Sequence, residues 1–159
     1  MGDLVLEILT QLRLIPELKF VTIWNNQFDY IEDGKTYSFP FPCAFVELVT
    51  NDFGQLGNRY QGVDVELKIH LGQEFYNGTN MDENLTIYSL RDKIVQNLSL
   101  YKASKTGPFT KINEQQDYDH NNVYHYQLTY LAHWIDDAAT ITTPSITGTT
   151  WTPIITGTT

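Results

Sequence analysis

The sequence has one cysteine, few basic residues and no long apolar run, and each shortage excludes a class of protein. Cys43 has no second cysteine to pair with, so no disulfide forms within the chain, which fits a reducing cytoplasm. No stretch approaches the roughly 18 consecutive apolar residues of a membrane-spanning helix, so we expect no membrane partner. Residues 1–4 lack the basic start of a signal peptide, and we expect none.

The balance of charge is strongly acidic. The chain has 10 Lys and Arg against 19 Asp and Glu, which gives a formal net charge of −9. Such a chain repels phosphates, which argues against a protein that grips nucleic acid. The same repulsion suits a wall that DNA slides past without binding, so a role beside DNA stays open.

Catalytic signatures are missing as well. The sequence contains no P-loop, no Gly-rich dinucleotide fingerprint, no nucleophile elbow and no HExxH motif. Cys43 lies in an apolar run and is predicted to be a structural residue. The one cluster with metal-ligand chemistry is Asp117, Asp119 and His120, with His125 a few residues further on. Because the end of any hairpin is polar, we predict no metal, no cofactor and no enzymatic activity, and a metal-dependent enzyme is the less favoured alternative.

The apolar content suffices for one globular domain that buries its own core: 42% of the 159 residues are hydrophobic and 13% are aromatic. Apolar residues recur at intervals of three and four in residues 3–15 and 80–98, which predicts two helices. The predicted buried positions are Leu4, Val5, Ile8, Leu9 and Leu12 in the first helix and Ile87, Leu90, Ile94 and Leu98 in the second.

Runs of β-branched and aromatic residues predict strands. The clearest run is residues 63–71, where apolar residues alternate with polar ones, as in a sheet with one buried face. Further strands are predicted at residues 19–24, 43–49, 109–118 and 123–135, and at 28–31 and 36–39 around an Asp33-Gly34 hairpin turn. The sequence therefore predicts an α+β fold, a single domain over residues 1–137 with a mostly antiparallel sheet flanked by two helices.

Histidines stand on the polar sides of two predicted strands. His70 alternates with the apolar residues of 63–71, and His133 alternates with those of 123–135. We predict that both are solvated or lie in an interface.

The composition changes near residue 138. Residues 140–159 are uncharged and rich in Thr, Ile, Pro and Gly, and the segment Ile-Thr-Gly-Thr-Thr occurs at 146–150 and again at 155–159. Such a segment cannot form a core by itself, so residues 138–159 are predicted to be an extended C-terminal arm that orders on a neighbour. Trp151, Ile154 and Ile155 are its predicted docking residues, and a floppy tail is the alternative.

Three segments carry a resemblance to a known family. They are the strand Pro42-Cys43-Ala44-Phe45-Val46-Glu47-Leu48, the helix centre Leu90-Arg91-Asp92, and the Asp-rich turn at 117–121 before the last strand. In order and pattern they resemble the tail-terminator (tail-completion) family of long-tailed bacteriophages, including the minor tail proteins of Mu-type prophages. The family strand has roughly the pattern Pro-x-Ala-x-Phe-Val-Glu, and the spacing in this chain is one residue tighter. The resemblance covers residues 3–136.

The resemblance implies a structural virion protein that is similar in fold to the tail-tube subunit. Members form a hexameric ring on the head-proximal end of the tube, which stops polymerisation and offers a surface to the head connector. The implied partners are further copies of the chain, the tail-tube protein, the connector or neck, and in some tails a sheath. DNA only passes through the lumen. The implied location is the tail or neck of the virion, assembled in the host cytoplasm.

A loop predicted over residues 51–61 is the candidate contact with a neighbouring subunit or with the tube. Its glycines give flexibility beside apolar groups, and its candidate contact residues are Phe53, Leu56, Arg59 and Tyr60. One alternative is another ring of the neck, the connector or a contractile injection machine. A further alternative is a ligand-binding module that uses the many tyrosines, which requires a concave aromatic pocket.

Overall fold

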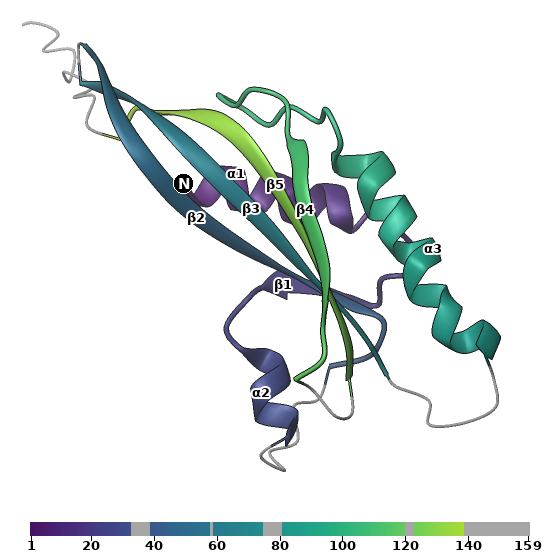
Figure 1. Cartoon of the computed structure of the whole chain (residues 1–159). Helices are drawn as coiled ribbons and strands as arrows, with labels where there is room; N and C mark the ends of the chain where they lie inside the picture. Colours follow the sequence, from purple (N-terminus) through teal and green to yellow (C-terminus); the bar gives the residue numbers. More distant parts are fainter. Residues whose placement is uncertain (33–38, 58, 75–80, 120–122, 139–159) are drawn as a thin grey trace, which may run out of the picture.

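The computed structural model describes residues 1–32, 39–57, 59–74, 81–119 and 123–138 of the chain (Figure 1). Side-chain positions within these ranges are described except for residues 30–32 and 81–84. The elements are α1 (Gly2–Leu12), β1 (Phe20–Ile23), α2 (Gln27–Glu32), β2 (Cys43–Gly57), β3 (Tyr60–Glu74), α3 (Met81–Leu98), β4 (Thr110–Asp117) and β5 (Val123–Asp136). The α+β prediction is confirmed.

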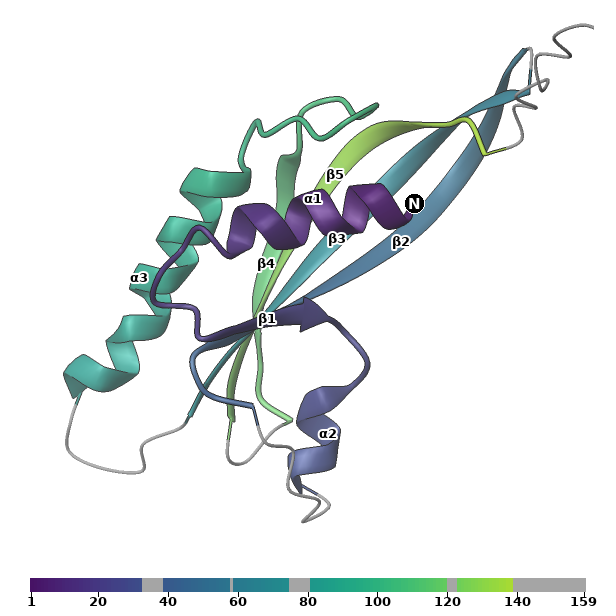
Figure 2. The same cartoon turned by 180° about the vertical axis from the view of Figure 1, so that it is seen from behind.

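The strands form one mixed, mostly antiparallel sheet in the order β1-β2-β3-β5-β4. The pairs β2–β3, β3–β5 and β4–β5 are antiparallel, whereas β1 runs parallel to the start of β2. The long central strands β2, β3 and β5 extend far beyond the end of the short edge strand β1, whose last residue, Ile23, pairs with Val46 (Figures 1 and 2). The end of the sheet formed by the β2–β3 hairpin and the end of β5 therefore projects from the body of the molecule.

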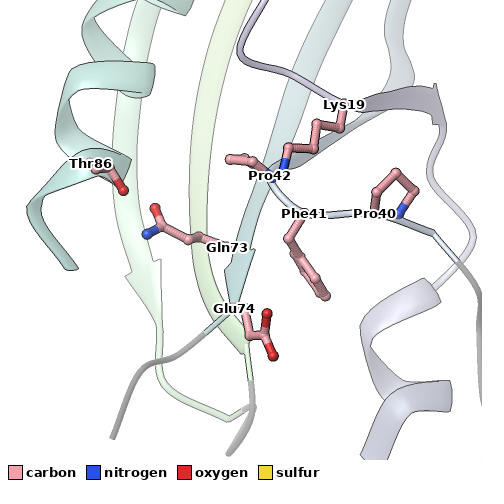
Figure 3. A pocket seen from close by; sticks show the side chains of 7 residues that line it. All are labelled: Lys19, Pro40, Phe41, Pro42, Gln73, Glu74 and Thr86. Atoms are coloured by element: carbon pink, nitrogen blue, oxygen red, sulfur yellow. The ribbon is translucent and has the colours of Figure 1, made fainter. Parts of the chain in front are cut away.

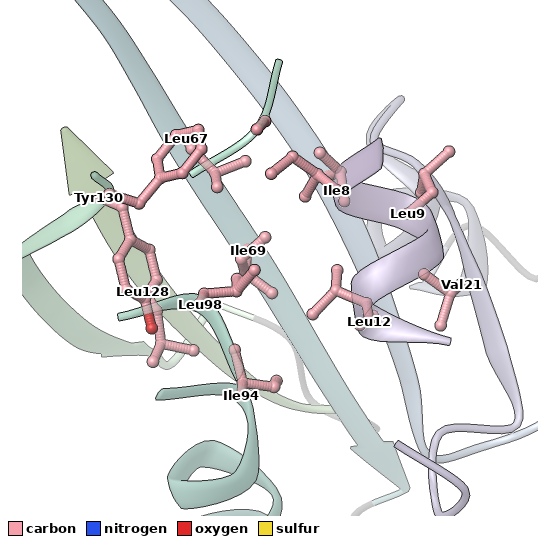
Figure 4. Close-up of a cluster of buried hydrophobic side chains, with 14 of the residues drawn as sticks. Ile8, Leu9, Leu12, Val21, Leu67, Ile69, Ile94, Leu98, Leu128 and Tyr130 are labelled. Atoms are coloured by element: carbon pink, nitrogen blue, oxygen red, sulfur yellow. The ribbon is translucent and has the colours of Figure 1, made fainter. Parts of the chain in front are cut away.

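The main core lies between the sheet and two helices, α1 and α3, which cover the same face (Figure 2). The alternation predicted for residues 63–71 is confirmed, because every second residue of this run is fully buried. The predicted helix faces are confirmed too, with Ile8 and Leu12 of α1 and Ile94 and Leu98 of α3 packed toward Ile69 and Leu128 (Figure 4). This face supplies most of the apolar burial that stabilises the fold.

A second, smaller core covers the opposite face near the start of β2. It contains Phe28, Phe39, Cys43, Phe45 and Val123, with Trp24 and Phe41 packed against it. Several of its rings meet edge-on, among them Phe28 and Phe45 at a centroid distance of 5.3 Å. Edge-to-face contacts of this kind stabilise aromatic clusters beyond the area they bury. The sheet is thus buried on both faces here, although its sequence pattern indicates one buried face.

One local prediction is wrong: residues 28–31, predicted as a strand of a hairpin, lie in the helix α2. Of the partner strand predicted at residues 36–39, residues 36–38 lie outside the described residues. The molecule therefore has a third helix beside the two predicted ones within the described ranges. The fully buried Phe28 explains the difference: the short helix places its ring into the second core, and this tertiary contact outweighs the β-propensity of the run.

The predicted C-terminal arm, with Trp151, Ile154 and Ile155, lies outside the described residues from 139 onward. His120 of the candidate metal cluster lies outside them as well.

Candidate functional site

The projecting end of the β2–β3 hairpin is the principal candidate surface. We call residues 52–57 and 59–62 the hairpin tip. Three of its large side chains are exposed to solvent: Phe53 at 57%, Leu56 at 58% and Tyr60 at 41%. Large apolar groups gathered at the end of a projecting element favour contact with a partner. The sequence correctly indicated exposure here, but the loop prediction for residues 51–61 was wrong, since nearly the whole segment is paired strand.

Backbone geometry explains how this segment forms a hairpin in spite of its turn-forming residues. The pairing is regular up to Asn51 opposite Asp64, then shifts register before Gly54 opposite Gly62. Asp52, with a φ of 50°, lies in this β-bulge. The hairpin turns after Gly57, whose φ of 88° suits a residue without a side chain, and Arg59 also has a positive φ of 68°. The bulge and turn re-aim the exposed side chains at the end of the strands.

The sheet face opposite α1 and α3 is polar and acidic where the second core ends. Lys68 lies 3.7 Å from Glu47 and 3.7 Å from Glu66, so one cation serves two carboxylates. Further along, His133 Nδ1 lies 3.1 Å from Asp64 Oδ1, and both side chains are about half exposed. These five strand positions lie on the polar side of the sheet, in keeping with the alternation of apolar and polar residues along β3 and β5. The face carries more negative than positive groups.

A chain of four polar side chains crosses the sheet beside the second core; its two histidines are buried, and its two carboxylates are about one-third exposed. His70 Nε2 lies 3.0 Å from Glu47 Oε2, and His70 Nδ1 lies 3.0 Å from His125 Nε2. His125 Nδ1 in turn lies 3.1 Å from Asp117 Oδ2. The chain thus links β2, β3, β5 and β4, and all four ring nitrogens of the two histidines have a partner. We call these residues the histidine chain.

Protonation of the histidine chain follows from counting its hydrogen bonds. Three hydrogen bonds need three protons, whereas two neutral imidazoles carry two, so the full set of hydrogen bonds requires one additional proton in the histidine chain. Burial lowers the pKa of His70, against a smaller raising effect of Glu47.

Aromatic rings cover the histidine chain. The Trp24 ring stacks on His70 at a centroid distance of 4.0 Å and an interplanar angle of 6°, and the Phe28 ring meets His125 at 4.8 Å. His70 is 5% and His125 is 2% exposed. The prediction that His70 is solvated or interfacial is therefore wrong, whereas His133 is exposed as predicted. The sequence grouped Asp117 with His125 as candidate metal ligands, but it could not link them to Glu47 and His70, which come from the distant strands β2 and β3.

Two residues of the alternative metal cluster, Asp117 and Asp119, lie within the described ranges, and His120 lies outside them. Asp117 is bound to His125, and its other oxygen accepts a hydrogen bond from the backbone N–H of Asp119 at 3.0 Å. This is the local geometry of a polar turn. Over the described ranges, no three His, Cys, Asp or Glu side chains are placed to hold one metal ion.

A cavity of about 440 Å³ opens between the start of β2, the end of β3 and α3 (Figure 3). Its lining includes Lys19, Gln73 and Glu74, and Phe41 closes one side. The described lining contains neither His nor Cys, and Cys43 is buried in the second core nearby, where burial raises the pKa of its thiol. A buried, protonated thiol is a poor nucleophile.

The tyrosines of the α3–β5 contact pack on one another. Tyr88 and Tyr124 hydroxyls lie 2.9 Å apart, Tyr124 donates to Gln116 at 2.7 Å, and the Tyr126 ring lies 6.0 Å from that of Tyr88. None of the described residues that line the cavity in Figure 3 is a tyrosine. These rings serve to attach α3 to the sheet.

None of the known family models matches this chain, and no curated protein matches it. Across the described ranges, no helix is long and apolar enough to cross a membrane.

Proposed function

We propose that this protein is a structural subunit of a phage tail. Copies of it close into a ring at the head-proximal end of the tail tube. The resemblance to tail terminators implies six copies in the ring. The ring ends polymerisation of the tube and joins the tail to the head connector. The hairpin tip carries this proposal, because it presents Phe53, Leu56 and Tyr60 to solvent at the far end of the sheet.

A projecting tip suits a ring because its partner surface lies elsewhere on the next copy. Such a contact is heterologous, and it closes into a ring when the rotation between neighbours divides a full turn. Full burial of a Phe or Leu side chain contributes about 1.5–3 kcal/mol, so half-exposed Phe53 and Leu56 together contribute about 1.5–3 kcal/mol per contact. That energy corresponds to roughly 10–150-fold in the association constant between neighbours.

The acidic sheet face supports the same proposal. A ring that joins tail to head surrounds the path of the DNA, and its inner wall must not bind phosphates. Glu47, Glu66 and Asp64 lie on one open face with a single lysine, Lys68, between two of them. Placed toward the lumen, this face repels DNA and lets it slide. The chain is accordingly proposed to be non-enzymatic and to reside in the tail or neck of the virion.

The proposal is tested by substitution of the hairpin tip. Phe53→Ser/Leu56→Ser should weaken self-association by roughly 10–100-fold, measured by sedimentation over a concentration series. The matched control is Leu14→Ser, which removes a side chain that is 64% exposed beyond the end of α1. If the tip variant, the control and the unaltered chain associate equally strongly, the hairpin tip does not join copies of the chain, and the proposal loses its main support.

Addition of each chain to growing tail tubes separates a terminator from other ring layers. A terminator shortens the tubes and marks one end of each tube, and the tip variant does so only at much higher concentration. A neck or connector ring forms without changing tube length.

A further inference from the structure

The outer edge of β2 is only partly paired. β1 ends at Ile23 opposite Val46, so residues 47–57 of β2 have β3 as their single strand neighbour. The carbonyl of Val46 accepts a hydrogen bond from the backbone N–H of Trp24 at 2.9 Å. The backbone N–H and C=O groups of every second residue in a strand point to the same side. Those of Leu48 and Thr50 therefore point in the same direction as those of Val46, away from β3. Within the described part of the chain, no strand lies across from them.

This edge has the properties of a strand acceptor. Residues 47–51 are regular and precede the bulge at Asp52, so they offer a straight run of about five residues, the usual length of a strand. An unprotected edge pairs readily with an added chain, because main-chain hydrogen bonds supply the affinity. Proteins commonly block such edges with lysine or proline, and residues 47–51 contain neither.

The C-terminal segment has the composition of an added strand. Residues 139–159 contain no Asp, Glu, Lys or Arg, so the net charge of −9 belongs to the rest of the chain. Two acidic bodies repel each other, whereas an uncharged segment approaches an acidic body without that penalty. β-Branched Thr and Ile, which favour strands, dominate the segment and form its two Ile-Thr-Gly-Thr-Thr copies.

The path of β5 favours an edge on another copy. β5 runs parallel to β2, since each of them is antiparallel to β3. Its last residue, Asp136, pairs with Gln61, which is next to the turn of the hairpin. The described chain therefore leaves at the projecting end of the molecule and heads away from the body (Figures 1 and 2). To reach the free edge of its own β2, the chain must reverse direction, because residues 47–51 lie level with residues 129–133 of β5.

We propose that a short stretch within residues 139–159 of one copy adds as a β-strand to residues 47–51 of β2 in a neighbouring copy. The inference rests on the proposed ring, and it names the contact that joins one subunit to the next in addition to the hairpin tip. Trp151, Ile154 and Ile155 are the apolar side chains that this strand brings to the neighbour.

Cross-linking between two single-substitution chains tests this contact directly. One chain carries Asn51→Cys, an exposed edge position, and the other carries one cysteine in the segment, at Thr142, Thr147 or Thr156 in turn. Cys43 is fully buried and does not compete for the reagent. After mixing and treatment with a short bismaleimide, a mixed dimer forms only if the segment of one copy lies on the edge of another.

The expected result is a mixed dimer for at least one of the three segment positions. A docked contact has an effective concentration near millimolar, so at micromolar protein the reaction should exceed random collision by on the order of a hundredfold. The matched control replaces Asn51→Cys with Leu14→Cys, an exposed position away from the edge, which should give only the collision level.

Three other results overturn the inference. No mixed dimer above the control at any position excludes the contact. A cross-link found only within a single chain that carries both cysteines shows that the segment folds back on its own edge. Mixed dimers that form equally with Leu14→Cys show non-specific association. Sedimentation of the same full-length chains distinguishes failure of the segment contact from failure of the proposed ring. If the chains form oligomers but do not cross-link, only the segment contact is overturned. If the chains are monomers at every concentration, the ring is overturned.

Discussion

Replacement of His125 by leucine should destabilise the fold strongly, because it cuts the histidine chain at its centre. His125 bridges His70 at 3.0 Å and Asp117 at 3.1 Å. Leucine is of similar size and apolar, so packing is largely kept while both hydrogen bonds are lost. Asp117 is 30% exposed and can be hydrated instead, whereas His70, whose side chain is 6% exposed, keeps a buried nitrogen without that partner.

The expected cost is the sum of two effects. A buried polar group that loses its partner costs about 1–3 kcal/mol, and loss of the ring contact with Phe28 adds about 0.5–1.5 kcal/mol. His125→Leu should therefore lower the free energy of unfolding by about 2–4 kcal/mol, measured by urea denaturation. For a domain of this size, that loss lowers Tm by roughly 8–15 °C.

The control is the same substitution at an exposed histidine of the same strand. His133 is half exposed and pairs with a half-exposed Asp64, so His133→Leu should change stability by no more than about 0.5 kcal/mol. The double variant His70→Leu/His125→Leu should cost about 1–2 kcal/mol less than the sum of its single variants, because no nitrogen is then left unpaired. Equal, small effects of His125→Leu and His133→Leu, with additive double-variant energies, would refute the histidine chain.

Three further predictions concern other contacts of the fold. Burial lowers the pKa of His70, so as pH falls the unfolded chain takes up a proton at a higher pH than the folded chain. The stability that His70 contributes is present above about pH 6.5 and should be lost as pH falls below that value. His70→Gln should make the free energy of unfolding, measured by urea titration at each pH, less dependent on pH in this range. Gly72→Ala should cost about 1–3 kcal/mol in the same assay, because its Cβ would lie 2.4 Å from the buried Phe28 ring, whereas Gly54→Ala, with nothing nearer than 3.9 Å, should be almost neutral. Arg91 binds both carboxylate oxygens of Glu114 and so joins α3 to β4. Arg91→Met should therefore lower the free energy of unfolding by about 1 kcal/mol, measured by thermal unfolding. An unchanged stability would mean that this ion pair does not stabilise the contact between α3 and β4.

Periodic segments of the main core were predictable from the sequence. The strand around Leu67 alternates strictly, and the helix with Ile94 repeats every three to four residues, because each element buries a single face against the same layer. Local pattern is sufficient where one face is buried and the other is wet.

The second core was not predictable in this way. Phe28, Phe39 and Phe45 come together from a helix, a connection and a strand, and the contact between them determines that residues 27–32 are helical. His70 stands in the polar half of an alternating strand, where solvation is the ordinary expectation. Its burial depends on Trp24, which stacks on it from more than forty positions away in the sequence.

The candidate surface was predictable in part. Exposure of Phe53, Leu56 and Tyr60 followed from apolar residues placed among glycines and polar residues. Their conformation did not, because the turn-forming residues Asn51, Asp52 and Gly54 indicate a loop, whereas pairing with β3 holds the segment in a bulged hairpin. Whether this surface joins copies depends on contacts between chains, which local patterns do not encode.

Negative-stain imaging of the purified full-length chain over a rising concentration series, alone and with isolated tail tubes, tests the ring most directly. The proposed function predicts particles with an open centre, with one ring on one end of each tube, and it predicts their loss in Phe53→Ser/Leu56→Ser but not in Leu14→Ser. A chain that stays monomeric at every concentration and leaves both tube ends bare would contradict it.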